Sequence, residues 1–94
     1  MEQSGVELEH LERLVVELAG QGLDARLVRR RAGSHVLVAS PDDPALNERV
    51  LCGAAADGGL CFLWPWRQPI GPVGELGVVA GKIKVVLRPV EGAG

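Results

Sequence analysis

The sequence predicts an α+β domain built as a two-layer sandwich: a four-stranded antiparallel meander with an N-terminal and a C-terminal helix (αββββα). Two observations lead to this prediction. A segment near the N-terminus repeats apolar residues every three or four positions, as an amphipathic helix does. The middle of the chain instead alternates short apolar or β-branched runs with turns rich in Gly, Pro and Asp. Consecutive strands joined by short turns form a meander, and both helices are expected on one face of it.

The first element is a helix over residues 6–19. Its leucines and valines recur at spacings of three and four, and glutamates occupy the other faces. Gly20 and Gly22 can adopt positive φ, so they are expected to end the helix.

The next two elements are short strands that form a hairpin. Residues 23–31 alternate side chains of opposite character, and residues 35–40 are apolar and β-branched. Ala32-Gly33-Ser34 between them is expected to form a tight turn. Residues 40–46 contain two prolines and two aspartates, which predicts a loop.

A second hairpin follows this loop. Residues 48–55 are expected to form the third strand and residues 60–66 the fourth, with a turn at Asp57-Gly58-Gly59. Pro65 ends the fourth strand or places it at an edge. Residues 67–74 are expected to form a loop.

The final segment, residues 75–88, has two interpretations. As a helix, its apolar residues fall at spacings of three and four; as strands, β-branched runs flank a turn at Gly81-Lys82. Gly77 and Gly81 each cost a helix about 1 kcal/mol relative to alanine. The pattern favours the helix slightly.

Three short motifs are shared with other sequences: Trp64-Pro65-Trp66, then Gln68-Pro69-Ile70-Gly71, then the closing Val85-Val86-Leu87. In these motifs the chain resembles small uncharacterised actinobacterial proteins that are often encoded beside helix-turn-helix regulators. The resemblance covers residues 48–88 best, and it implies a bacterial source and a closing helix. It implies no reaction, cofactor or catalytic residue.

The composition excludes several classes of protein. A chain of 94 residues has room for one small core, so a single domain over residues 1–94 is expected, with frayed ends at 1–4 and 89–94. The net charge of −2 argues against a general nucleic-acid or anionic-membrane binder. The longest apolar run is far shorter than the roughly 18 residues of a membrane span, and the N-terminus is acidic. We therefore expect a cytoplasmic protein.

No catalytic constellation stands out. Cys52 and Cys61 lack the paired spacing of a zinc site and are expected to be free, buried thiols on the same face of the sheet. Asp42 and Asp43 lie in a proline-bracketed loop, where aspartates usually bind their own backbone. Neither a nucleophile motif nor a phosphate-binding glycine loop occurs. We therefore expect no enzymatic activity, no metal and no cofactor.

A basic run at residues 29–31 follows Arg26 in the sequence. On a strand, Arg26 and Arg30 share one face and could contact phosphates. The alternative is a solvated hairpin end that keeps the edge strand from pairing wrongly.

The aromatic residues Phe62, Trp64 and Trp66 are the strongest functional lead. These residues stand at alternate positions, so they should lie on one face of the fourth strand. The opposite face of that strand is apolar too. Two helices can cover one face only, so a second copy, another protein or a ligand should cover the other. We expect a non-enzymatic interaction module that forms a homodimer, and the resemblance to the actinobacterial proteins implies an accessory to a transcriptional regulator. The alternatives are a small-molecule pocket at the tryptophan face, or tryptophans that complete the core beneath the helices.

Overall fold

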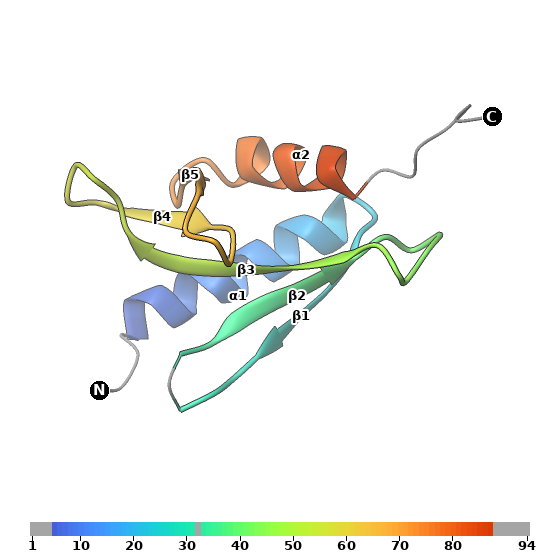
Figure 1. Cartoon of the computed structure of the whole chain (residues 1–94), viewed down its shortest axis with the longest axis horizontal. Helices are drawn as coiled ribbons and strands as arrows, with labels where there is room; N and C mark the ends of the chain where they lie inside the picture. The colour runs from blue at the N-terminus through green and yellow to red at the C-terminus, as the bar shows by residue number, and fades with distance from the viewer. Residues whose placement is uncertain (1–4, 32, 88–94) are drawn as a thin grey trace.

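The computed structural model describes residues 5–31 and 33–87. Over these residues two helices and five strands follow in the order α1 (Gly5–Gly20), β1 (Asp24–Val28), β2 (His35–Ala39), β3 (Asn47–Ala54), β4 (Leu60–Leu63), β5 (Pro69–Pro72) and α2 (Leu76–Val86). The strands form one antiparallel sheet in the order β1-β2-β3-β4-β5 (Figure 1). The α+β class and the antiparallel meander are therefore confirmed.

The expectation of four strands was wrong, because residues 67–74 contain β5 rather than only a loop. Pro69 and Pro72 stand at the two ends of this edge strand, where a missing N–H disrupts the ladder least. The predicted fourth strand also stops earlier than expected, at Leu63. The chain then turns over residues 64–68 into β5.

The long strand β3 joins two halves of the sheet. Its residues 47–50 pair with β2, and its residues 51–54 pair with β4. Figure 1 shows β3 running lengthwise between the β1–β2 half and the β4–β5 half. The β3 strand is therefore the centre of the sheet, and each of its two neighbours pairs with one half of it.

Residues 76–86 of the final segment form a helix, so the strand interpretation is excluded for them; Arg88 lies outside the described residues. Val79, Ala80 and Ile83 of α2 are buried. A Cβ added at Gly77 or Gly81 would meet nothing within 4 Å, so both glycines lie on the open side of the helix.

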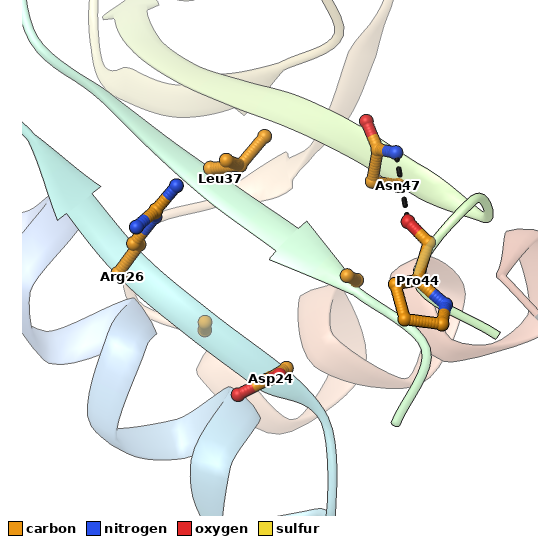
Figure 2. A pocket seen from close by; sticks show the side chains of 7 residues that line it. Asp24, Arg26, Leu37, Pro44 and Asn47 are labelled. Atoms are coloured by element: carbon orange, nitrogen blue, oxygen red, sulfur yellow. Dashed lines mark hydrogen bonds between the residues drawn. The ribbon is translucent and has the colours of Figure 1, made fainter. Parts of the chain in front are cut away.

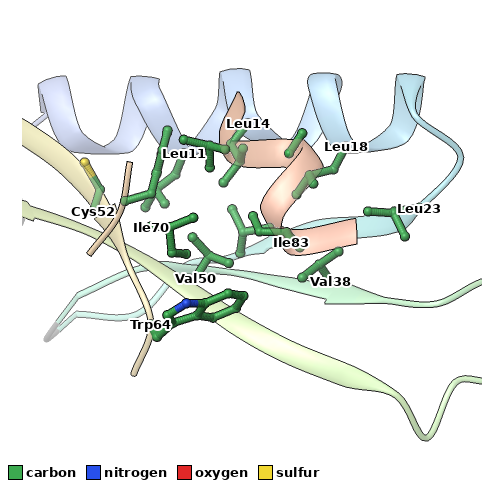
Figure 3. Close-up of a cluster of buried hydrophobic side chains, with 14 of the residues drawn as sticks. Leu11, Leu14, Leu18, Leu23, Val38, Val50, Cys52, Trp64, Ile70 and Ile83 are labelled. Atoms are coloured by element: carbon green, nitrogen blue, oxygen red, sulfur yellow. The ribbon is translucent and has the colours of Figure 1, made fainter. Parts of the chain in front are cut away.

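The core lies between the helices and the sheet (Figure 3). The α1 helix contacts β1, β2, β3 and α2, and α2 also contacts β5. The three leucines that α1 buries are Leu11, Leu14 and Leu18, and they are fully covered. Burial of each such side chain stabilises the fold by roughly 1.5–3 kcal/mol. The predicted helical stripe is therefore the inner face of α1.

The cysteines are free and buried, as expected, but they do not share a sheet face. Cys52 pairs with Phe62, and Cys61 pairs with Gly53. Residues directly opposite each other share a face and successive residues alternate, so Cys52 and Cys61 point to opposite faces. The five residues between Ala54 and Leu60, with Gly58 at φ 91°, set this register.

Some expectations fall on other parts of the chain. The frayed ends at 1–4 and 89–94, and Ala32 of the first hairpin turn, lie outside the described residues. Neither of the described helices is long and apolar enough to cross a membrane.

Candidate functional site

The three aromatic side chains do not lie together on an open face, which corrects the expectation from their parity. Phe62 is fully buried and Trp64 is 7% exposed, and both belong to the core cluster. Figure 3 shows Trp64 at the margin of that cluster, on the side away from α1. Of the three, only Trp66 is accessible, with 57% of its surface exposed. The alternate spacing of these residues predicts a shared face, but it does not show which face of the sheet the helices cover.

Trp66 is held in one orientation by the turn over residues 64–68. Its ring stacks on Trp64, with 5.6 Å between ring centroids and planes 9° apart. Its indole Nε1 donates a hydrogen bond to Oε1 of Gln68 at 2.9 Å. The backbone N–H of Arg67, which has φ 71°, donates to the Trp64 carbonyl at 2.9 Å. Trp66 is therefore an exposed aromatic side chain fixed on a buried one.

The outer side of α2 is also apolar. Val78, Val85 and Val86 are each at least half exposed. Gly77 and Gly81 leave the surface beside these valines open. Lys82 and Lys84 are the exposed charged residues of the same helix. The sequence pattern pointed only to the buried stripe of this helix.

The outer face of the β1–β3 half is mixed rather than apolar, which corrects a second expectation. Cross-strand register places Arg26, Leu37 and Arg49 in one row. The neighbouring row contains Asp24, Ala39 and Asn47. Polar side chains therefore flank the apolar centre of this face. Arg49 was not among the residues expected at a site, because its place beside Leu37 depends on the register of β2 with β3.

A pocket of about 390 Å³ opens on this outer face (Figure 2). Three strands and the loop before β3 line it, through Asp24, Ala25, Arg26, Leu37, Ala39, Pro44 and Asn47. The amide nitrogen of Asn47 donates to the carbonyl oxygens of Pro44, at 3.0 Å, and Ala45, at 3.3 Å. The loop wall of the pocket is thus fastened to β3.

Positive charge gathers beside this pocket. Partial burial lowers the pKa of His35, and the nearby guanidinium groups of Arg49 and Arg30 lower it further. Arg30 lies beyond the end of β1 and is exposed, so the expected strand face shared with Arg26 ends at Val28. Arg29 instead pairs with Glu12 of α1 at 3.2 Å. Arg26 and Arg49 therefore share the outer face, whereas Arg30 lies beyond the end of β1, near His35.

The thiols are poorly suited to reaction. Burial raises the pKa of Cys52 to about 12, with smaller contributions from Glu7 and Cys61. Burial also raises the pKa of Cys61, with a contribution from Asp57. Both groups are therefore protonated at neutral pH, and the thiol is a weak nucleophile. Across residues 5–31 and 33–87, no three His, Cys, Asp or Glu side chains are grouped so that they could hold a metal ion.

No family model matches the chain, and the searches of curated proteins and of solved structures return no match either. The resemblance to small actinobacterial proteins therefore stays a prediction.

Proposed function

We propose that the protein is a non-enzymatic interaction module that forms a homodimer through the outer side of α2. The observation that supports this is the exposed apolar strip formed by Val78, Val85 and Val86. Exposed apolar side chains gathered on one element are typical of interaction surfaces. This surface replaces the outer sheet face as the expected interface, because that face is polar around Leu37.

A second copy of the chain is the partner we propose, because a two-fold dimer covers the same apolar surface on both copies. The charged side chains nearby are mostly engaged within one copy: Lys82 donates to the Ile70 carbonyl, and Glu9 and Glu12 of α1 pair with Arg13 and Arg29. The two helices contact each other within one copy. In a two-fold dimer, the exposed valines of α2 in one copy can pack against those of the other. Lys82 lies between Val78 and Val85 along this face, but its Nζ is held at the Ile70 carbonyl of its own copy.

Analytical ultracentrifugation across micromolar concentrations tests this proposal. We expect a dimer whose dissociation constant rises at least tenfold in Val85→Glu, because the variant would bury an unpaired carboxylate. Ala56→Glu, which adds the same charge at an exposed turn position, should leave the dimer unchanged. A wild-type chain that stays monomeric throughout this range would contradict the proposal.

Trp66→Glu tests whether the exposed tryptophan of the turn, rather than the valines of α2, forms the interface. If Trp66→Glu abolishes the dimer and Val85→Glu does not, the turn over residues 64–68 is the interface and the assignment to α2 is wrong. If only Val85→Glu weakens the dimer, Trp66 is available to another partner. A fixed, exposed tryptophan is a typical anchor of protein interfaces.

The cellular setting is the part of the proposal that rests on the resemblance alone. We propose a cytoplasmic accessory to a bacterial transcriptional regulator. A pull-down with the wild-type chain and with Trp66→Glu, analysed by mass spectrometry, tests it. Recovery of a helix-turn-helix regulator with the wild type only would support this role. Recovery of no regulator by either chain would contradict it.

A further inference from the structure

Three paired strands, β1, β2 and β3, frame the pocket on the outer face of the sheet. The polar side chains at its two ends differ in kind. Strands β1, β2 and β3 supply most of its lining, and the loop at Pro44 closes one side (Figure 2). Its volume of about 390 Å³ lies in the range of pockets that hold small molecules, roughly 300–1,000 Å³. The homodimer proposed above does not use this face.

One end of the pocket is cationic: Arg26 lines it, and Arg49, which pairs with the lining residue Leu37, lies next to the lining. Arg26 and Arg49 flank Leu37 from the two neighbouring strands, so their Cα atoms lie about 10 Å apart, two strand spacings. Side chains of this length can converge on one group above Leu37. Within the described residues, neither guanidinium has a carboxylate close enough for an ion pair. Arg49 and Arg30 both lie close enough to His35 to disfavour its imidazolium, so arginine side chains gather beside this end although the whole chain has a net charge of −2.

The other end accepts hydrogen bonds. Asp24 and Asn47 lie two residues along the strands from Arg26 and Arg49, a distance of about 7 Å. The Asn47 amide nitrogen is engaged with the Pro44 and Ala45 carbonyls, so its Oδ1 is the atom that can accept from a ligand. The Asp24 carboxylate oxygens accept hydrogen bonds, and hydroxyl groups are suitable donors to Asp24 and Asn47.

We propose that this pocket binds a small phosphate monoester that carries hydroxyl groups, the chemical class of the sugar phosphates. A phosphate group has three terminal oxygens and can accept hydrogen bonds from two guanidinium groups at once. The hydroxyl groups would then reach Asp24 and Asn47. The pocket lining contains no aromatic side chain on which a nucleobase could stack. Asp24 would repel the next phosphate of a polynucleotide, so a single phosphate fits better than a nucleic acid.

Binding can be measured by two-dimensional NMR with glucose 6-phosphate, inorganic phosphate and glucose as probes. We expect saturable shifts at Arg26, Leu37 and Asn47 with glucose 6-phosphate, at least tenfold weaker binding of inorganic phosphate, and no binding of glucose. Arg26→Gln and Arg49→Gln should each weaken glucose 6-phosphate binding at least tenfold. Asp24→Asn should weaken glucose 6-phosphate binding and leave inorganic phosphate binding unchanged or slightly stronger.

Two controls separate this site from general charge and from the dimer. Arg67→Gln removes an exposed arginine from the turn over residues 64–68 and should not change the affinity. Val85→Glu should not change the affinity for glucose 6-phosphate either. The pocket proposal can therefore be tested even if the dimer proposal fails. Arg26 and Arg49 are exposed, so both variants should melt as the wild type does.

Three results would overturn the proposal. The first is the absence of saturable binding at millimolar glucose 6-phosphate. The second is binding that persists unchanged in Arg26→Gln and Arg49→Gln. The third is tighter binding of a single-stranded oligonucleotide than of glucose 6-phosphate, lost in the same two variants, which would assign the face to nucleic acid.

Discussion

Gly71 of β5 lies so close to Val79 of α2 that a Cβ at position 71 would stand 2.9 Å from the Val79 Cγ2 atom. The helix therefore rests directly on the backbone of the edge strand. Lys82, one turn further along α2, donates a hydrogen bond from Nζ to the Ile70 carbonyl at 2.9 Å. These two contacts fasten α2 to the strand that the sequence did not predict.

Gly71→Ala should lower the free energy of unfolding by about 1–3 kcal/mol, because the added methyl group overpacks the contact with Val79. Chemical denaturation measures this loss. Gly74→Ala is the matched control, since a Cβ there meets nothing within 4 Å. The contact with Val79 would be refuted if the two alanine variants were equally stable. In a double-mutant cycle, Val79→Ala should offset part of the cost of Gly71→Ala.

Ile83→Ala should cost about 2–5 kcal/mol, because it removes a fully buried side chain from the core. Lys84→Ala, at the next position and exposed, should change stability by less than about 0.5 kcal/mol. Thermal melts followed by circular dichroism compare the two. Equal melting temperatures for both variants would mean that α2 does not pack as described.

Stability should fall as the pH rises above about 9. The pKa of Cys52 is about 12 in the folded protein and 9.0 without the fold's influence, so the unfolded chain loses the thiol proton first. The stability that the protonated Cys52 thiol contributes is fully present below pH 9 and is lost as the pH rises towards 12. Cys61 acts in the same direction. Urea denaturation at pH 8 and pH 10.5 should show a smaller alkaline loss in Cys52→Ala than in the wild type. An equal loss in both would contradict the raised pKa.

His35 should titrate below its ordinary pKa of 6.5, since burial and the charges of Arg49 and Arg30 disfavour the imidazolium. A lowered pKa in the folded state contributes stability above pH 6.5 that is lost as the pH falls through the folded pKa. NMR titration of the imidazole should show the pKa rising in Arg49→Gln. A pKa at or above 6.5 in the wild type would argue against the cationic end of the pocket.

Local sequence signals predicted most of the fold. The spacing of leucines in α1 and the alternation in β1 and β2 depend on each segment alone. The β5 strand could not be predicted in this way, because Pro-Ile-Gly-Pro has little strand propensity and its pairing with β4 depends on the cover that α2 provides. The helical form of α2 was predictable only in part, since Gly77 and Gly81 weaken the helical pattern.

The candidate sites were harder to predict, because they depend on register and on which face is covered. Parity placed Phe62 and Trp64 together, but only the packing of the helices makes their face the inner one. Trp66 escapes burial because β4 ends at Leu63 and the chain turns. Arg49 joins Arg26 only through a register across β2, which no local pattern encodes.

The meander order has a consequence for how the chain folds. Each strand pairs only with its neighbours in sequence, so every hairpin can nucleate by closing a short loop. The contact between α1 and α2 is different, since it joins segments separated by the entire sheet and has a larger loop-closure entropy cost. We expect the hairpins to form early and the docking of α2 onto α1 to be the late, rate-limiting step. Ile83→Ala should then speed unfolding much more than it slows folding.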